Sequence, residues 1–223
     1  MSSPLGTARL VLRGEDGEVV ADGRRWFAEA DEVDKSLLDR AIPPVLDVGC
    51  GPGRHVLALA RRGVESLGLD IAPSLVRLAR ERGAPAVQGS VFGPVPAAGT
   101  WGTVLLLDGN IGIGADPVAL LAAVASVLAP GGRILAEVAS AARADAPVPT
   151  GPGPLARVDH DGRLGPPFRW CPVDAARLAR CAAAAALPLT ALWSAGERRF
   201  AQIDLAGARG SARRASSTVA RPA

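Results

Sequence analysis

The chain has 223 residues and a formal net charge of +3, which is long enough for one domain whose core needs no disulfide or metal. Hydrophobic residues make up 48% of the sequence, yet no apolar run approaches the roughly 20 residues that a membrane span requires. The first residues lack the basic start and apolar stretch of a secretory signal. We therefore expect a cytoplasmic protein with no membrane partner.

Cysteine usage and charge argue against a protein held together by disulfides or zinc, and against one that binds nucleic acid. The three cysteines are odd in number and show no CxxC spacing, so neither a disulfide framework nor a zinc site is expected, and no metal is predicted. Residues 207–223 carry four arginines and no acid, which leaves residues 1–206 with a net charge of −1. This composition predicts a disordered basic tail and a nearly neutral body that does not bind nucleic acid.

Residues 1–42 begin the predicted elements. Two short β segments flank the turn GEDG, which predicts a hairpin. Between Arg24 and Ala41 apolar residues recur at intervals of three and four, which predicts one helix that ends before Pro43. Hairpin and helix together form a predicted lid on a single domain over residues 1–206.

From residue 45 onward short apolar strands alternate with helices. Strands that are apolar on both faces predict a mostly parallel sheet with helices on both sides, a doubly wound α/β fold. The predicted strands are 45–48, 65–70, 86–89, 102–108 and 133–138, and the predicted helices are 55–62, 73–82 and 117–128. Residues 140–167 are rich in proline and glycine and predict a long functional loop. A helix over 173–186 and an edge hairpin, 189–194 with 198–205, complete the pattern.

The strongest chemical signal is the segment VLDVGCGPGRH, residues 45–55. Glycines between a strand and a helix allow a sharp turn and let a ligand approach the main chain where a Cβ would collide. The third glycine is Gly53, whereas the dinucleotide pattern GxGxxG would need it at Arg54. Asp47 can accept hydrogen bonds from an ammonium, and a helix N-terminus suits a carboxylate. These features predict a ligand with an amine, held by Asp47, and a carboxylate, held by the amides from Gly49 to Gly53.

The same segment resembles the first signature of class I S-adenosylmethionine-dependent methyltransferases. The likeness extends through LGLDIAP, LLLDGNIG and LLAAVASVLAPGGRILAEV. The resemblance implies a Rossmann-like sheet of seven strands with an antiparallel last strand. It also implies the cofactor S-adenosylmethionine, which becomes S-adenosylhomocysteine when its methyl group is transferred.

The resemblance assigns residues to the cofactor. Asp70 stands where the family holds the ribose hydroxyls, and Ser90 stands where an aspartate commonly binds adenine. Ser90 can accept one hydrogen bond from the base but brings no charge. The predicted cofactor-binding residues are Asp47, Gly49, Cys50, Gly51, Gly53, His55, Asp70, Ile71, Gly89, Ser90, Val91, Asp108 and Asn110.

The residues expected to contact the methyl acceptor follow the fourth predicted strand or lie in segments that flank it. Asp108 is the candidate general base. It can instead make a non-catalytic contact with cofactor or substrate, or cap the turn. His160 is a weaker candidate for the base. The predicted substrate-binding residues are Trp26, Asn110, Ile111, Phe168 and Trp170. The acceptor is expected to be a small molecule, because no (D/N)PP(Y/F) motif follows this strand and no basic groove is evident.

Three functions remain open at this point. Methyl transfer to an oxygen, nitrogen or carbon atom of a small molecule is the prediction. A non-methylating protein of the same fold, or a binding module, is the alternative. A third hypothesis, an NAD(P)-dependent oxidoreductase, is opposed by the GxGxG spacing and by Asp47.

Overall fold

A computed structural model describes residues 8–14, 17–139, 155–160 and 163–206. Its larger sheet has seven strands in the order β11-β12-β7-β6-β3-β4-β5. Strand β12 runs antiparallel to both of its neighbours, and the pairs from β7 to β5 are parallel. The strands are β3 (Val45–Val48), β4 (Ser66–Asp70), β5 (Ala86–Gln88), β6 (Trp101–Leu106), β7 (Leu128–Val138), β11 (Leu189–Ala195) and β12 (Arg198–Asp204). The predicted doubly wound sheet with an antiparallel last strand is confirmed.

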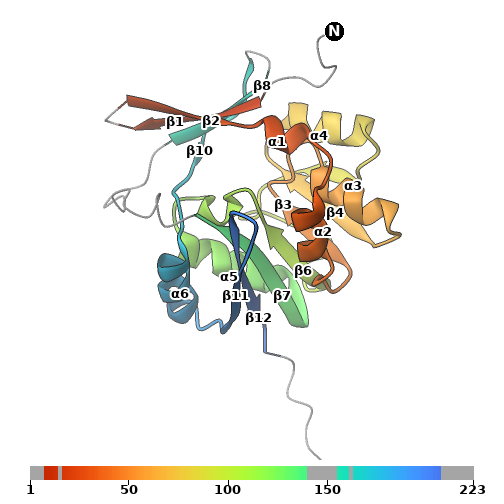
Figure 1. The fold of residues 1–223 in the computed structure, drawn as a ribbon, viewed down its shortest axis with the longest axis vertical. Helices are drawn as coiled ribbons and strands as arrows, with labels where there is room; N and C mark the ends of the chain where they lie inside the picture. The colour runs from red at the N-terminus through yellow and green to blue at the C-terminus, as the bar shows by residue number, and fades with distance from the viewer. Residues whose placement is uncertain (1–7, 15–16, 140–154, 161–162, 207–223) are drawn as a thin grey trace, which may run out of the picture.

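Helices cover both faces of this sheet (Figure 1). They are α2 (Glu32–Leu38), α3 (Arg54–Arg61), α4 (Pro73–Glu81), α5 (Pro117–Val127) and α6 (Ala175–Ala184). Successive strand residues alternate between the faces. In β6 Val104 packs in the cluster with α5 and α6, whereas Leu105 packs with α2 and α3. The central strands are therefore buried on both sides, as their continuous apolar runs predicted.

The predicted helix over residues 24–41 is wrong in one respect, because the structure divides it. Helix α1 (Arg24–Phe27) ends at Ala28, whose backbone is extended, and α2 starts after Asp31. Asp31 and Asp34 form a capping box in which each side chain accepts the backbone N–H of the other. Such a box starts a new helix, and the apolar spacing that spans both helices does not reveal the break.

A second, smaller sheet lies beyond one end of the central sheet (Figure 1). It contains β1 (Ala8–Gly14), β2 (Gly17–Asp22), β8 (Leu155–His160), β9 (Arg163–Leu164) and β10 (Phe168–Arg169). Strand β8 pairs with β1, β9 and β10. The loop predicted over residues 140–167 is therefore wrong from residue 155 onward, because its strands pair with a hairpin almost 150 residues away in the chain. Residues 140–154 and the predicted tail, 207–223, lie outside the described residues.

Backbone contacts join the small sheet to the end of β6. The N–H of Gly114 donates to the carbonyl of Arg169 at 2.8 Å, and the N–H of Cys171 donates to the carbonyl of Gly112 at 3.1 Å. Gly112 is required here, since a Cβ at this position would lie 1.9 Å from the carbonyl oxygen of Cys171. This contact holds the segment after β10 against the turn after β6.

Candidate functional site

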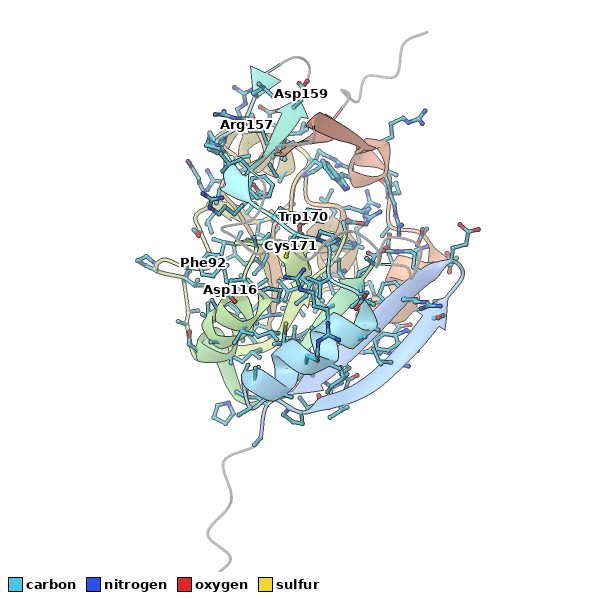
Figure 2. All side chains as sticks on the ribbon, turned by 90° about the vertical axis from the view of Figure 1, so that its left-hand side faces the viewer. Phe92, Asp116, Arg157, Asp159, Trp170 and Cys171 are labelled. Carbon is cyan, nitrogen blue, oxygen red and sulfur yellow. The ribbon has the colours of Figure 1, made fainter. Side chains whose placement is uncertain are left out.

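A cavity of about 450 Å³ lies at the carboxyl ends of β3, β4, β5 and β6. Chain order reverses here, since β4 lies on one side of β3 and β6 on the other. Such a switch point is where open α/β sheets bind ligands. Residues from α1 and from the small sheet contribute to the other walls. Figure 2 shows Trp170 and Cys171 between the small sheet, which carries Arg157 and Asp159, and the central domain.

Most of the predicted site residues line this cavity. They are Trp26, Gly49, Cys50, Gly51, His55, Asp70, Ile71, Gly89, Ser90, Val91, Asp108, Asn110, Phe168 and Trp170. Three predicted residues are not on its wall: Asp47, Gly53 and Ile111. Ile111 is 1% exposed and packs in the core beneath the turn.

The amides of the glycine loop already have acceptors within the chain. The N–H groups of Gly49 and Cys50 donate to the carbonyl of Leu69 at 2.7 and 3.2 Å. The N–H of Gly51 donates to Oδ2 of Asp70 at 2.9 Å. These hydrogen bonds attach the loop to β4, and a contact of the same amides with a ligand carboxylate stays a prediction.

Gly53 also has a structural task. Its φ of +86° turns the chain into α3, and a Cβ there would lie 2.7 Å from the Cβ of Ala84 and 3.2 Å from that of Ala79. Its N–H donates to the carbonyl of Cys50 at 3.0 Å. The third glycine of the motif therefore lets α3 pack closely on the end of α4.

The first two glycines meet the cavity in different ways. A Cβ at Gly51 would meet no atom within 4 Å, so the main chain there is open to a ligand. A Cβ at Gly49 would lie 2.6 Å from Nδ2 of Asn110. That amide donates to the carbonyls of Val48 and Gly49 at 2.9 and 3.0 Å. Asn110 thereby ties the turn after β6 to the loop after β3.

Asp70 closes the cofactor side at the end of β4. Its Oδ1 accepts the N–H of Ala72 at 2.8 Å, and its Oδ2 accepts that of Gly51. Burial raises the pKa of Asp70, although these backbone hydrogen bonds act in the opposite direction. Because a carboxylate offers about four lone-pair positions, both oxygens can still accept from ligand hydroxyls.

Ser90 and Phe92 follow β5 at the same edge. The Ser90 hydroxyl accepts the N–H of Phe92 at 3.2 Å, so it organises the turn as well as lining the cavity. Phe92 is 49% exposed and also lines the cavity. A Cβ at Gly114 would lie 2.7 Å from Cζ of Phe92, which shows how closely the ring approaches the turn after β6.

Ionised side chains from distant parts of the chain gather beneath the cavity, and we call this set the charged floor. Helix α2, strands β3, β7 and β12, helix α3 and the turn after β6 each contribute to it. Every side chain in it is at most 18% exposed. Its members are Asp34, Asp47, Arg54, His55, Asp108, Glu137 and Arg198.

Asp34 is the fully buried centre of the charged floor. Its carboxylate lies 2.6 Å from Nη1 of Arg198 and 3.5 Å from Nη1 of Arg54, from Nε2 of His55 and from Nη2 of Arg25. Burial by itself raises the pKa of Asp34, but His55, Arg54 and Arg198 outweigh burial and hold this pKa well below its usual range. Helix α2 is thereby attached to the floor of the cavity through one ionised side chain.

His55 lies between two carboxylates of the floor. Nδ1 of His55 is 3.5 Å from Oδ2 of Asp47. Burial lowers the pKa of His55, but the neighbouring carboxylates of Asp34 and Asp47 outweigh burial and raise the pKa to about 9. Asp47 is 1% exposed and its Oδ2 has no hydrogen-bond partner. Asp47 faces His55 and is not on the cavity wall, so its contact with a ligand amine stays a prediction.

Asp108 lines the cavity as part of an ion pair. Nη2 of Arg54 donates to both carboxylate oxygens at 2.9 and 2.7 Å, and the Asp108 N–H donates to Oε2 of Glu137 at 2.9 Å. These contacts hold Asp108 at a φ of +53°, which is uncommon for any residue but glycine. As a general base Asp108 would have to break the pair with Arg54, so the geometry favours its interpretation as a fixed negative charge.

The acceptor side is formed by the turn after β6 and the segment after β10. Nε1–H of Trp170 donates to the carbonyl of Gly109 at 2.9 Å, and Ile113 forms a β-bridge with Trp170. Phe168 and Ile113 line the cavity beside them. The side chain of His160, the weaker predicted base, lies outside the described residues.

Several residues of the wall were not predicted. Arg54 is one of them, although an arginine that opens a helix behind a glycine loop is a signal of charge at this place. Phe92 also had a signal, because it follows Ser90 and Val91 directly. Another group had no signal, since pairing between distant strands brings its members to the cavity: Val158, Gly165, Pro166 and Arg169.

Two features are absent from the described residues. No helix in this part of the chain is long and apolar enough to cross a membrane. Nor does this part contain a group of three or more histidine, cysteine, aspartate or glutamate side chains that is suited to hold a metal ion.

Residues 45–132 match the family model described as a methyltransferase domain. The matched span starts at β3 and contains the glycine loop, Asp70, the turn after β5 and Asp108. The matched span is therefore similar to methyltransferase domains, and the sheet has the Rossmann-like methyltransferase fold. A solved S-adenosylmethionine-dependent methyltransferase of Bacteroides fragilis, in complex with S-adenosylhomocysteine, is similar to it with a TM-score of 0.72 and 26% identity. That likeness covers 89% of this chain and 88% of the other, so it includes segments outside the matched span.

Curated relatives match this chain over a shorter stretch than the Bacteroides fragilis structure does. A magnesium-protoporphyrin O-methyltransferase of Rhodobacter capsulatus is 38% identical over 105 residues, which are 42% of this chain and 47% of that protein. A ubiquinone biosynthesis O-methyltransferase of Xanthomonas euvesicatoria pv. vesicatoria is 36% identical over 104 residues, 44% of this chain and 43% of that protein. The match therefore spans less than half the length of these relatives.

Proposed function

We propose that this protein binds S-adenosylmethionine in the cavity and transfers its methyl group to a small-molecule acceptor, releasing S-adenosylhomocysteine. One observation carries the proposal: an open main chain at Gly51 and the carboxylate of Asp70 meet in a cavity at the switch point of a methyltransferase domain. The solved relative from Bacteroides fragilis, which holds S-adenosylhomocysteine, supports the choice of cofactor.

The residues present fit such a cofactor. Asp70 can accept hydrogen bonds from two vicinal ribose hydroxyls, since each of its oxygens keeps a lone pair beyond its backbone donor. Ile71, Val91 and Gly89 offer apolar surface and close main-chain approach for the base. Ser90 is the candidate polar contact with the base. Gly51 leaves the space that a ligand needs beside the loop.

The charged floor suits the cationic end of the cofactor. Four carboxylates of the floor face Arg54, Arg198, protonated His55 and the neighbouring Arg25, so the negative charge offered to the cavity is that of Asp108 alone. Asp108 is the member of the floor whose carboxylate lines the cavity. We propose that Asp108 attracts positive charge in the cavity. Asn110 would hold the turn that carries Asp108 in position.

The bound sulfonium supplies a methyl group that is already activated for in-line displacement by an acceptor atom. The protein then has to hold the acceptor close and aligned, an effect that can contribute roughly 7–11 kcal/mol. Trp170, Phe168 and Trp26 form walls that can do this. The hairpin with α1 and α2 remains our proposal for a lid, and a cytoplasmic location without a nucleic-acid partner stays a prediction from the sequence.

Isothermal titration calorimetry of the full chain tests the cofactor assignment. We expect S-adenosylhomocysteine to bind and NADH not to bind. Binding of NADH without S-adenosylhomocysteine would instead support the oxidoreductase hypothesis. Formation of S-adenosylhomocysteine from S-adenosylmethionine, assayed with phenols, amines and thiols as acceptors, then separates a methyltransferase from a non-methylating binding module.

A further inference from the structure

Aromatic residues are distributed unevenly in this protein. The chain has four tryptophans, four phenylalanines and no tyrosine. Phe27, Trp101 and Phe200 are buried in the cores, and Trp193 packs against Phe200 with ring centroids 5.6 Å apart. The other four line the cavity: Trp26, Phe92, Phe168 and Trp170. Half of the aromatic residues therefore leave part of their rings at one cavity, where they are available to a ligand.

Trp170 is held rigidly at the acceptor side. Its Nε1–H donates to the carbonyl of Gly109, and the β-bridge with Ile113 fixes its backbone. A Cβ at Gly109 would lie 3.2 Å from Cζ2 of the ring, and a Cβ at Gly112 would lie 3.0 Å from Nε1. The ring thus packs directly on a turn without side-chain bulk. A fixed aromatic surface binds at a low cost in conformational entropy.

Apolar residues line the same cavity as this ring. They are Ile113, which forms the β-bridge with Trp170, and Ala119, Pro166 and Phe168. A flat apolar molecule can cover such a surface and gain stacking in addition to hydrophobic burial, because aromatic pairs favour offset or edge-to-face contacts. An aliphatic molecule of the same size gains only the burial.

The size of the cavity limits the acceptor. Its volume of about 450 Å³ lies in the lower part of the range of about 300–1,000 Å³ that is typical of a pocket for one drug-sized ligand. On the proposed function, the same cavity also houses S-adenosylmethionine. The space left beside Trp170 therefore suits one or two fused rings and not a large macrocycle.

We infer that the methyl acceptor is a small aromatic molecule of one or two rings that stacks on Trp170 and contacts Phe168. This inference rests on the proposed function for the presence of a cofactor in the other half of the cavity. The aromatic selectivity of the wall itself can be measured without any turnover.

The experiment compares 2-naphthol with decahydro-2-naphthol, its saturated counterpart. Binding of each probe to the full chain is measured by ligand-observed saturation-transfer NMR and by calorimetry, with and without saturating S-adenosylhomocysteine. We expect 2-naphthol to bind about tenfold more tightly than the saturated probe, as one or two aromatic contacts would allow. Protoporphyrin IX, a flat macrocycle, is expected not to bind.

Two variants of the cavity wall and one matched control locate the effect. Trp170→Leu removes the ring from the cavity and should abolish the tenfold preference, and Phe168→Leu should reduce it. Trp193→Leu makes the same change at a tryptophan packed in the core beside Phe200 and should preserve the preference. Retained affinity for S-adenosylhomocysteine shows that each variant is folded.

The outcomes separate this inference from the proposed function. Equal binding of the two probes, or no binding of either, by a protein that binds S-adenosylhomocysteine overturns the aromatic acceptor and leaves the methyltransferase assignment intact. Tight binding of protoporphyrin IX also overturns it. If S-adenosylhomocysteine does not bind, the proposed function fails, and the probe comparison without cofactor still decides whether the wall selects aromatic molecules.

Discussion

The two halves of the cavity are built in different ways. The cofactor half comes from consecutive strand ends, with its residues between Val48 and Phe92, and backbone hydrogen bonds to β4 hold its loop. The acceptor half combines Trp26, the turn after β6 and the segment from Gly165 to Trp170. A local motif can specify the first half, because its residues are neighbours in the chain. The second half exists only when the small sheet pairs and docks.

The charged floor lies beneath both halves, and its loss should have the largest effect. Asp34→Asn leaves Arg54, Arg198 and His55 without their shared carboxylate. Breaking a buried ion pair by removing one partner typically costs about 3–5 kcal/mol. Denaturant unfolding should show a loss of this size. Asp39→Asn is the control, since Asp39 pairs with Arg62 at the surface, where about 0–1 kcal/mol is expected; equal losses would contradict the central position of Asp34.

The cofactor half can be tested alone through Asp70. Asp70→Ala should weaken the binding of S-adenosylhomocysteine about 100-fold, because two hydrogen bonds to an ionised carboxylate contribute about 1.5–3 kcal/mol each and part of this is recovered by water. Calorimetry gives the dissociation constant. Asp39→Ala, a change of the same type far from the cavity, should leave it unaltered. An unchanged constant for Asp70→Ala would remove this residue from the cofactor site.

The acceptor half can be disturbed through Gly112. Gly112→Ala places a Cβ 1.9 Å from the Cys171 carbonyl oxygen, so the segment after β10 has to move. We expect a loss of about 1–3 kcal/mol in unfolding free energy, which is typical of overpacking. Gly93→Ala is the control, because its Cβ would lie 3.5 Å from the nearest atom, an ordinary contact.

The same pair of variants also sharpens the contrast between the halves. If the two halves of the cavity are built independently, Gly112→Ala should weaken the binding of 2-naphthol more than that of S-adenosylhomocysteine. A parallel loss of both affinities would show that the two halves behave as one unit.

His55, a member of the charged floor, should give the stability of the protein a pH dependence. The pKa of His55 is raised to about 9 in the folded protein, against about 6.5 in an unfolded chain. Protonation therefore favours folding, and this contribution is complete below pH 6.5 and is lost as the pH rises to about 9. The melting temperature should therefore fall over this interval. In His55→Gln this slope should flatten, and an unchanged slope would assign it to another group.

The pattern of strands and helices predicted the central sheet well. Runs such as Val45–Val48 and Trp101–Leu106 are apolar on both faces, and only a sheet covered on both sides buries such runs. Glycine spacing likewise predicted which strand end faces the ligand. The predicted helix over 24–41 failed because the capping box of Asp31 and Asp34 breaks it, and the predicted loop failed because the partner strand of β8 is in the first 14 residues.

The sequence by itself determined the doubly wound sheet, the position of the cavity and most residues of its cofactor half, since these depend on local periodicity and on glycines next to a strand. Only the tertiary structure decided what the polar groups do there. It turned the loop amides toward β4, placed Asp47 behind His55 and paired Asp108 with Arg54. Hydrogen bonds and ion pairs join groups far apart in the chain, and no local pattern specifies which of them will meet.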